Sequence, residues 1–485
     1  MKTLVMKFGG TSTGNVKALN RAADIVVAQY GQWDRMVVVV SAMEGVTDML
    51  IDCAEGSLAE DKNHYQAIIA ELRNKLNALV WPIFAGDQSY EGLMVLIDTR
   101  IQELTNICQR IQLQGKSSPR DMDEIAAMGE RINVQVFSAL LRKRGVLCES
   151  IEATELIVTD DCYQAASPIQ NETDAHVNAE LLPLLAEAII PVVAGFIGAT
   201  PDGTTTTLGR GGSDYTAAIL GKSLRADEVW IWTDVDGVMT ADPGLTPEAR
   251  LISEISYSEV YELAYFGAKV LHPKTILAAR EANFPLWVKN TFNPECKGTK
   301  IGNCSPAENF EVSAVTGLFD ICLLTARLMP GRDLSKKIWI EISEALSKQG
   351  ISPLAIFWGS RERSICCAFS EKSYNHAIHA LEQESSLRLL GSSFSRFQVT
   401  DNIALITAVG RRIYDAPQVL QKISVVLEKA GVGMKIIRAS PDSLIFSVAN
   451  KDGEHAIKHI HDEVILNDPL ISPITQPAPK HLTAI

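Results

Sequence analysis

The 485-residue chain has neither a hydrophobic run long enough to cross a membrane nor a surplus of basic residues. A helical span needs roughly 18 to 20 consecutive apolar residues, so no membrane association is expected. The N-terminus reads directly into a strand-like stretch, residues 3–6, without the pattern of a secretory signal, which favours a cytoplasmic location. The formal net charge of −13 disfavours nucleic acid as a partner, because nucleic acid is bound by basic surfaces.

Cysteine is sparse and forms no recognisable motif. The nine cysteines are an odd number, and none of them shows the spacing of a metal-binding or redox site. The one adjacent pair, Cys366 and Cys367, lies in an alternating stretch typical of a strand. We therefore expect reduced, structural thiols and no disulfide framework.

The length and composition favour several packed domains. A chain of this size, 46% hydrophobic, can form roughly two to four domains, each with its own core. Up to about residue 301, apolar runs such as residues 36–40 and 189–193 alternate with amphipathic helical segments. This alternation predicts an α/β fold with a mainly parallel sheet sandwiched by helices. Turn-forming residues cluster at 293–306, so the first domain is expected to occupy residues 1–305.

This alternation is interrupted once and is later replaced by a repeat. Between about residues 48 and 130 helical periodicity dominates, which predicts a helical insertion. Ile342 and the Leu, Lys and Gly that follow it recur from Ile423, an offset of 81 residues (423 − 342). Each copy reads strand, helix, strand, strand, helix, strand. This order predicts two ferredoxin-like α+β modules, at residues 311–390 and 395–478.

A first glycine motif, residues 7–12 (Lys-Phe-Gly-Gly-Thr-Ser), lies between a strand and a helical segment. Its glycines let backbone N–H groups approach phosphate oxygens, and Lys7 can neutralise charge on a transferred phosphoryl group. The lysine precedes the glycines, so the motif is not a Walker loop. The alternative is an ordinary strand-to-helix turn with a surface lysine.

A second motif, residues 204–214, combines four threonines with the sequence Gly-Arg-Gly-Gly-Ser-Asp and leads into an apolar helical run. Arg210 can bind a carboxylate through two parallel hydrogen bonds. Asp214 can orient Lys7 or a magnesium-bearing phosphate. The alternative is a glycine-rich hairpin in which the arginine and aspartate have no special role.

A third stretch, residues 232–243, follows the apolar strand at 228–231. Loops at the carboxyl ends of parallel strands bind ligands in α/β sheets, so this loop could hold the base and ribose of a nucleotide. Its acidic residues could also be simple turn formers. Phosphoryl transfer needs little covalent chemistry from the protein, so a lysine, an aspartate and phosphate-binding glycines suffice for it.

Together these motifs resemble those of the aspartate kinases, which belong to the amino-acid kinase family, and the resemblance covers essentially the whole chain. It identifies residues 1–305 as a catalytic domain and the C-terminal repeat as two ACT modules. It implies that ATP, with Mg²⁺, phosphorylates the side-chain carboxylate of L-aspartate. That reaction is the first step of lysine, threonine and methionine biosynthesis.

The resemblance also implies roles for single residues. Lys7 and Asp214 would be the catalytic pair. Glu130 would receive the substrate ammonium and Arg210 its α-carboxylate, and this leaves the β-carboxylate facing ATP. The other expected substrate contacts are Ser41, Thr47 and Ser213. The expected nucleotide contacts are Lys7, Gly9, Gly10, Ser12, Thr233, Asp234, Met239 and Lys269.

Two positions near these motifs depart from the commonest pattern of the family, and a histidine near them needs its own interpretation. Met239 stands where the family often has tyrosine, and Gly244 stands where arginine is frequent, so both bear on nucleotide binding. His272 lies beside a proline in residues 266–273 and is expected to be structural rather than catalytic.

ACT modules pair side by side and hold a free amino acid at their interface. The turn containing Gly331, Arg332 and Asp333, with residues 411–415 in the second module, is where an effector such as lysine or threonine is expected. Pairing of the modules would form a homodimer or homotetramer. The alternative is that the repeat serves dimerisation alone.

Two other functions remain open. The first is a related kinase that acts on glutamate, acetylglutamate or a nucleoside monophosphate; Glu130, Arg210 and the double repeat argue against it. The second is a catalytically silent amino-acid sensor, which would predict loss of Lys7 or Asp214. No dinucleotide-binding fingerprint follows the second repeat, so a fused homoserine dehydrogenase is not expected.

Overall fold

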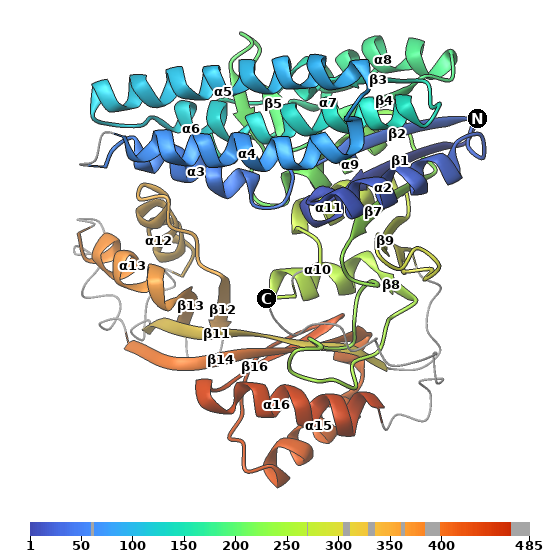
Figure 1. Cartoon of the computed structure of the whole chain (residues 1–485). Coiled ribbons are helices and arrows are strands. Elements are labelled where there is room, and N and C mark those ends of the chain that lie inside the picture. Colours follow the sequence, from blue (N-terminus) through green and yellow to red (C-terminus); the bar gives the residue numbers. More distant parts are fainter. Residues whose placement is uncertain are drawn as a thin grey trace. The chain divides into compact units, whose positions relative to one another are not determined.

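The computed structural model describes residues 1–59, 63–268, 270–303, 311–327, 335–359, 364–383 and 398–466. By its contacts the chain divides into two compact units (Figure 1). The N-terminal unit consists of Met1–Val238, Leu251–Tyr261 and Lys269–Ser305, and the C-terminal unit of Met239–Arg250, Glu262–Ala268 and Pro306–Ile485. The last segment of the N-terminal unit ends at Ser305. Two segments of the expected first domain, Met239–Arg250 and Glu262–Ala268, belong to the C-terminal unit.

Strand β1 (Thr3–Phe8) lies within an eight-stranded sheet of the N-terminal unit, in the order β3-β4-β2-β1-β7-β9-β10-β8. Neighbouring strands run parallel except for β9 and β10. The residues of β1 and β4 are all buried, as expected for strands covered on both faces. The predicted mainly parallel sheet is confirmed. The other strands are β2 (Arg35–Val40), β3 (Cys148–Ile151), β4 (Ile190–Ala194), β7 (Glu228–Thr233), β8 (Glu254–Ser256), β9 (Leu286–Asn290) and β10 (Thr299–Gly302).

Helices cover both faces of this sheet. Lys7 and Phe8 are adjacent on β1 and therefore point to opposite faces. The Lys7 ammonium contacts Asp214 on α9, whereas the Phe8 ring lies 5.7 Å from the ring of Phe137 on α7. The helices of this unit outside the insertion are α1 (Gly10–Thr13), α2 (Val16–Gln29), α8 (Gln170–Ala186), α9 (Gly212–Ser223) and α11 (Pro273–Ala282), with the 3-10 turn η1 (Ala153–Glu155) and the hairpin of β5 (Ile197–Ala199) and β6 (Thr205–Thr207). Helix α10 (Tyr257–Tyr265) begins in this unit, and its residues from Glu262 on belong to the C-terminal unit.

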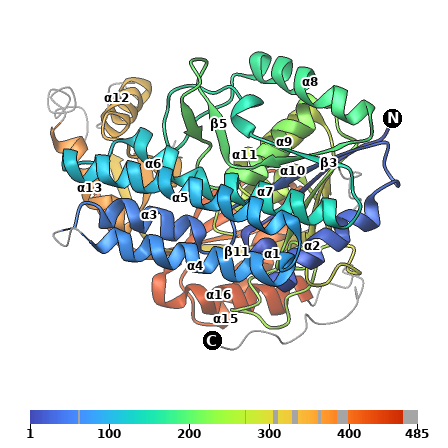
Figure 2. The same ribbon diagram turned by 45° about the horizontal axis from the view of Figure 1, so that its top comes forward.

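The predicted helical insertion, about residues 48–130, is confirmed: its described residues form α3 to α6, and α7 begins at its end and leads on to β3. Figure 2 shows α4 and α5 of this group running side by side. Local signals set their ends: Asp87 caps the start of α5, Gly115 follows its end with a φ of 66°, and Ser118 with Asp121 forms a capping box that begins α6. The helices are α3 (Val46–Gly56), α4 (His64–Phe84), α5 (Gln88–Gln114), α6 (Pro119–Ala126) and α7 (Met128–Lys143).

The C-terminal unit is built on a six-stranded antiparallel sheet in the order β12-β13-β11-β14-β16-β15. Two long strands at its centre, β11 and β14, pair with each other along most of their lengths. The strands are β11 (Glu311–Arg327), β12 (Ala355–Gly359), β13 (Ser364–Ser370), β14 (Gln398–Arg411), β15 (Lys435–Ser440) and β16 (Ser443–Ala449). The helices are α12 (Ser335–Ser347), α13 (Glu371–Gln383), η2 (Ile413–Asp415), α15 (Pro417–Lys429), η3 (Asn450–Asp452), α16 (Gly453–Ile460) and the π-helical η4 (His461–Leu466).

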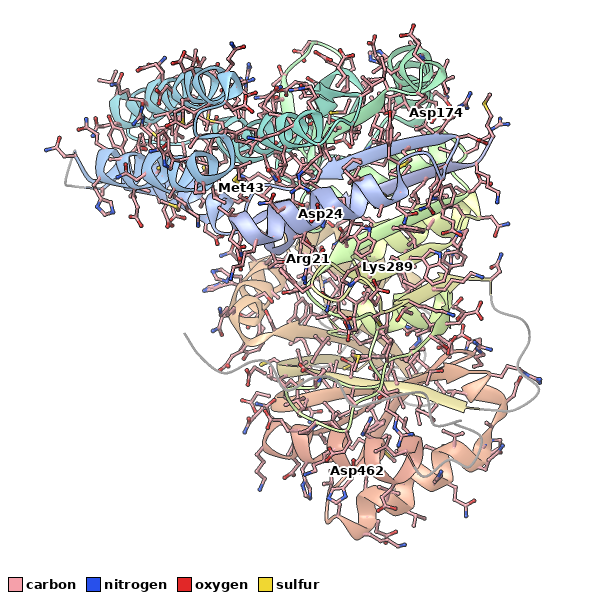
Figure 3. The ribbon with its side chains drawn as sticks, turned by 45° about the vertical axis from the view of Figure 1, so that its right-hand side comes forward. Arg21, Asp24, Met43, Asp174, Lys289 and Asp462 are labelled. Carbon is pink, nitrogen blue, oxygen red and sulfur yellow. The ribbon has the colours of Figure 1, made fainter. Side chains whose placement is uncertain are left out.

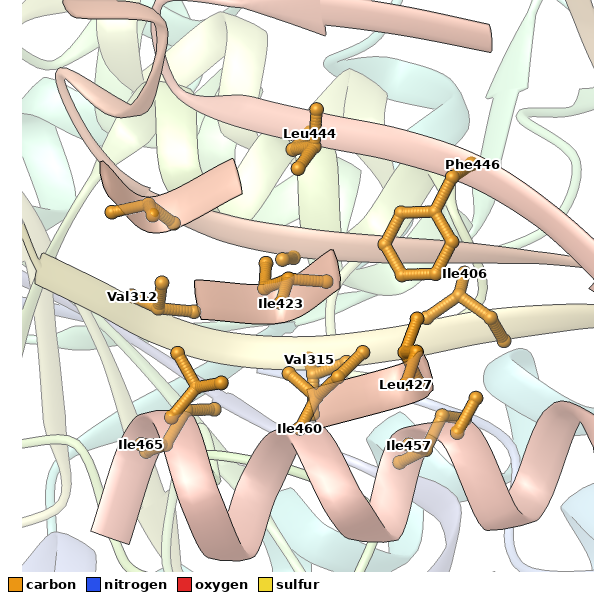
Figure 4. Close-up of a cluster of buried hydrophobic side chains, with 14 of the residues drawn as sticks. Val312, Val315, Ile406, Ile423, Leu427, Leu444, Phe446, Ile457, Ile460 and Ile465 are labelled. Carbon is orange, nitrogen blue, oxygen red and sulfur yellow. The ribbon is translucent and has the colours of Figure 1, made fainter. Parts of the chain in front are cut away.

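The two repeats share their central strands rather than following one another. Val312 and Val315, at the start of β11, pack with Ile423 and Phe446 in one core (Figure 4). Leu324, near the end of the same strand, belongs instead to a second core with residues of α12, β13 and α13. The first module is thus inserted after the first strand of the second. This packing differs from the consecutive ranges expected from the sequence, because one long strand serves both cores.

The segment Met239–Arg250 contributes to the core of the second module. Ala241 is buried in the same apolar cluster. The backbone oxygen of Thr240 accepts a hydrogen bond of 2.9 Å from the Val315 N–H. The Thr240 hydroxyl shares a hydrogen bond of 2.9 Å with Nε2 of His461, a side chain that is fully buried. A stretch expected to bind nucleotide therefore also completes the C-terminal unit.

Among the residues described above, no helix combines the length and apolar character required to span a membrane. Eight cysteines fall within the same ranges, and all are free thiols. Burial raises the pKa of Cys53, Cys108 and Cys367 to about 12, so these thiols are protonated and unreactive at neutral pH.

Candidate active site

A lysine–aspartate ion pair lies at the carboxyl end of β1. Lys7 Nζ is 2.6 Å from Oδ1 of Asp214, and the two side chains are 10% and 15% exposed. Asp214 lies in the first turn of α9, which begins after Gly211 with a φ of 70°. The pair therefore combines a nearly buried ammonium with a helix N-terminus, which also favours negative charge. Both features suit a phosphoryl group.

The first glycine motif follows this lysine directly. A Cβ at Gly9 would lie 3.4 Å from Lys7 Nζ, and a Cβ at Gly10 would lie 3.0 Å from the backbone oxygen of Ala42. The lack of side chains here keeps the backbone open beside the ammonium. Ser12 is different: its buried hydroxyl is 2.7 Å from Oγ1 of Thr291 and 3.2 Å from a backbone oxygen of β7. The structure thus gives Ser12, an expected ATP contact, partners within the protein.

Glu130 is the most perturbed carboxyl group of the site. It lies in the first turn of α7 and is 4% exposed. Burial raises its pKa to about 8, while hydrogen bonds from the backbone of Ala42 and of Glu130 itself and the charge of Lys7 lower the pKa. Its Oε2 atom is buried without a hydrogen-bond partner among the described residues. A buried acceptor of this kind suits a ligand ammonium, which would supply the missing partner.

Asn133, one turn further along α7, was not expected from the sequence. Its Nδ2 atom donates to the backbone oxygen of Ser41 at 2.6 Å and to Oγ1 of Thr13 at 3.1 Å. The Ser41 N–H in turn donates to the Phe8 oxygen at 3.1 Å. Asn133 therefore joins the first glycine motif to the expected substrate loop. Its position three residues after Glu130, on the same helical face, was the only signal in the sequence.

The expected substrate loop packs tightly against the start of α7. A Cβ at Gly129 would lie 2.6 Å from that of Ala42, so only glycine allows this approach. Thr47 follows this loop in the sequence and is half-buried in the first turn of α3. Ser41 and Glu130 are brought together by this contact.

The second glycine motif exposes Arg210 between Gly209 and Gly211, whose φ values are 78° and 70°. These left-handed conformations favour glycine. Ser213 is buried and packs so closely on Gly195 that a Cβ there would lie 2.7 Å from its own. Arg210 is therefore free to meet a ligand, whereas Ser213 contacts the protein.

His272 packs against the same loop. A Cβ at Gly211 would lie 2.5 Å from that of His272, and Nδ1 of His272 accepts the Lys274 N–H at 3.2 Å to cap α11. Burial lowers the pKa of His272, and so do the charges of Lys274 and Arg210. The capping bond gives the residue a structural role.

The expected nucleotide loop is held by amide side chains. Asp236 accepts from Nδ2 of Asn290 at 2.7 Å and of Asn293 at 3.1 Å, and Thr233 Oγ1 donates to Asp234 at 3.0 Å. Asp234 is exposed. Met239 packs against the core of the C-terminal unit, and Lys269, Gly331, Arg332 and Asp333 lie outside the described residues.

Lys289 is a cation that the sequence did not suggest (Figure 3), and its register with Trp232 and Phe8 puts it on the sheet face opposite Lys7. Its Nζ atom lies 5.0, 5.5 and 5.1 Å from the ring centroids of Trp230, Trp232 and Trp287. Burial lowers the pKa of Lys289. The three indole faces stabilise this charge next to Asn290, at the end of β9.

Comparison with known proteins agrees with this geometry. Residues 2–290 match the profile of the amino acid kinase family, and the chain belongs to that family. Within it, the relatives are aspartokinases, so the resemblance to aspartate kinases is confirmed. The lysine-sensitive aspartokinase 3 of Escherichia coli is 32% identical over 462 residues, which cover 95% of this chain and 99% of that protein.

Longer relatives match as well. The bifunctional aspartokinase/homoserine dehydrogenase 2 of Arabidopsis thaliana is 32% identical over 473 residues, which cover 96% of this chain and 51% of the relative. The chain thus spans about half the length of the bifunctional relatives that it matches.

Solved structures confirm the fold. Aspartokinase III of E. coli in complex with aspartate and ADP superimposes with a TM-score of 0.81 at 31% identity and covers 96% of this chain and 100% of that one. The complex of the same enzyme with lysine and aspartate gives a TM-score of 0.73 with the same coverage.

Proposed function

We propose that the chain is an aspartokinase, which transfers the γ-phosphoryl group of ATP to the β-carboxylate of L-aspartate to form 4-phospho-L-aspartate. The observation that carries this proposal is the proximity of two opposite features. A lysine–aspartate pair beside open glycines suits a phosphoryl group, and the buried Glu130 Oε2 atom lacks a partner that an ammonium would supply. Ala42 packs against both Gly10, which follows Lys7 in the first glycine motif, and Gly129, which precedes Glu130; this shared neighbour supports a single site.

Substrate binding and phosphoryl transfer can each be assigned to particular residues. Glu130 would bind the α-ammonium of aspartate and Arg210 its α-carboxylate, which orients the β-carboxylate towards ATP. Lys7 would stabilise negative charge on the transferred group, and the N–H group of Gly10 would bind a phosphate oxygen. The Gly9 N–H already donates to the Trp232 oxygen at 3.1 Å, so Gly9 would contribute only its lack of a side chain. Similarity to an aspartokinase solved with aspartate and ADP supports this assignment of the two ligands.

Mg²⁺ belongs to the proposal. Mg²⁺ is usually bound by one or two carboxylates together with substrate phosphates, so a dedicated protein cage is not required. Asp214 provides such a carboxylate beside the glycines. When bound with ATP, the ion would neutralise charge on the phosphates, while Asp214 would continue to orient Lys7.

We further propose that the C-terminal unit binds an amino-acid effector, with lysine ahead of threonine. The similar E. coli enzyme is named lysine-sensitive, and its complex with lysine and aspartate covers 96% of this chain. Pairing of the modules would give a homodimer or homotetramer. The free thiols of the described residues support a cytoplasmic location, where thiols are kept reduced.

The test is ADP release with L-aspartate, with L-glutamate and N-acetylglutamate as control acceptors, and with lysine, threonine or methionine added singly. Aspartate-dependent release that lysine suppresses would support both proposals. Release with glutamate or N-acetylglutamate alone would move the chain to another acceptor. A sensor without activity would bind an amino acid in calorimetry but release no ADP with any acceptor.

A further inference from the structure

Asp123, on α6, is a buried carboxylate for which the proposed chemistry has no use. It is only 1% exposed. Its Oδ1 atom accepts the Thr207 hydroxyl at 2.7 Å, and its Oδ2 atom accepts the Thr207 N–H at 3.0 Å. The Gln164 N–H donates to both oxygens, at 3.1 and 3.0 Å. A buried charge is costly unless it is fully hydrogen-bonded, so these four contacts define one specific arrangement of the backbone.

One end of this arrangement is the loop that carries Arg210. Thr207 ends β6, three residues before Arg210. Between them, Gly209 folds over the second residue that Asp123 holds: a Cβ at Gly209 would lie 3.0 Å from the backbone oxygen of Gln164. Asp123 therefore sets the position of both backbone segments from which the arginine loop departs.

The other end is the helix that carries Glu130. The Ala127 N–H donates to the backbone oxygen of Asp123 at 3.0 Å, and α7 begins at the next residue. A second link runs parallel to the first, because the Arg131 guanidinium donates to Thr205 Oγ1 at 3.1 Å. The start of α7 and strand β6 are thus joined at two points, one on each side of Glu130 in the sequence.

We infer that Asp123 is a positioning residue that sets the spacing between Glu130 and Arg210 and so fits the site to the ammonium and α-carboxylate of an α-amino acid. The inference rests on the proposed function, in which these two groups bind the substrate zwitterion. The contacts of Asp123 run to the Arg210 and Glu130 segments and not to the glycines beside Lys7. Loss of Asp123 should therefore weaken aspartate binding and leave ATP binding nearly unchanged.

The experiment measures the KM of each substrate for four variants. Asp123→Asn keeps the shape but replaces one acceptor with a donor that faces N–H groups, and should raise the aspartate KM by about 10- to 100-fold. The ATP KM should stay within roughly threefold, because a displaced amino-acid site leaves the phosphate contacts in place. Thr207→Val removes a single contact and should raise the aspartate KM by a smaller factor. Thr207→Ser keeps the hydroxyl and should behave as the unaltered protein.

Thr173→Val is the matched control. Thr173 is fully buried in the same unit, and its hydroxyl bonds the Val158 backbone at 3.1 and 3.2 Å, not Thr207 or Gln164, which Asp123 holds. This variant should lower the thermal midpoint without changing either KM. If Asp123→Asn does not fold, Thr207→Val and Thr207→Ser carry the test, because each leaves the carboxylate in place.

The results distinguish a failure of the positioning role of Asp123 from a failure of the proposed aspartokinase function. Equal increases in both KM values, or an unchanged aspartate KM in a folded Asp123→Asn or Thr207→Val protein, would overturn the positioning role alone. An unaltered protein without aspartate-dependent turnover would overturn the proposed function, and the positioning role with it.

Discussion

Lys7 Nζ and Asp214 Oδ1 lie 2.6 Å apart and join the end of strand β1 to the first turn of α9. Lys7 is 8% exposed, so it is not the surface lysine of an ordinary turn. Alanine at this position would leave the carboxylate without its cation, which can cost about 3 to 5 kcal/mol when the pair is buried. A test of catalysis therefore needs a variant that keeps the charge.

Lys7→Arg is expected to keep the fold and lose most of the turnover. Arginine retains the positive charge, but its planar guanidinium cannot replace a compact ammonium beside Gly9. We expect turnover to fall by about 10²- to 10³-fold, the usual loss when one preorganised electrostatic contact is removed. Steady-state ADP release and circular dichroism would measure the two properties. A folded Lys7→Arg protein with near-normal turnover would exclude Lys7 from the chemistry.

Glu130→Gln should change the pH dependence of aspartate binding. The folded-state pKa of Glu130 is raised to about 8, whereas the bound ammonium favours the carboxylate. Binding should therefore release a proton, and the aspartate KM of the unaltered protein should fall as the pH rises from 6 to 8. Glu130→Gln should raise the aspartate KM by about 10- to 100-fold, because a charge-assisted hydrogen bond is lost. The KM of this variant should also no longer change with pH between 6 and 8 through this group.

Glu130→Gln should weaken aspartate binding but raise the stability of the protein at alkaline pH. A carboxyl group with a raised pKa in the fold is protonated there while the unfolded chain is already ionised, so the free energy of unfolding falls between about pH 4.5 and 8. Glutamine removes this penalty. Without aspartate, the Glu130→Gln protein should melt at a higher temperature than the unaltered protein at pH 8.5, and the two should converge at pH 5. A constant difference across this range would contradict the buried-carboxyl interpretation.

Arg210→Ala should weaken aspartate binding without destabilising the protein. Arg210 is exposed, and substitutions of exposed residues usually change the free energy of unfolding by less than about 0.5 kcal/mol. Loss of its contact with the α-carboxylate should raise the aspartate KM by about 10- to 100-fold. Arg210→Lys should be intermediate, because lysine keeps the charge but not the two-pronged contact. An unchanged aspartate KM in the alanine variant would remove Arg210 from the substrate site.

His461 should make the C-terminal unit sensitive to acid. Burial lowers its pKa, and Arg250 acts in the same direction, while Asp462 and Glu248 oppose this shift. A histidine that is neutral in the fold must gain a proton on unfolding, so stability falls as the pH drops below about 6.5. The protection factors of β14 and β16 amides, which correct for the slower intrinsic exchange at acid pH, should therefore fall between pH 7 and 5.5. His461→Gln should reduce this loss of protection; an unaltered acid response would assign it to other groups.

Much of the fold was predictable because its signals are local. Apolar runs marked the parallel strands, helical periodicity marked α3 to α6, and a repeated pattern from Ile342 and Ile423 marked the two modules. Interleaving of the modules was not predictable, since nothing in β11 distinguishes Val312, which serves one core, from Leu324, which serves the other. The membership of Met239–Arg250 in the C-terminal unit likewise depends on contacts with residues far along the chain.

The sequence by itself determined the class of fold and the expected chemical groups of the site. Strand periodicity and glycine spacing are local patterns, and Lys7, Arg210 and Asp214 each lie within a short motif. Only the tertiary structure decided the state of those groups. Lys7 is buried, Glu130 has a raised pKa, and Asp123 holds two loops together because distant segments exclude water around them. Desolvation depends on the whole packed unit, and no local pattern of residues encodes it.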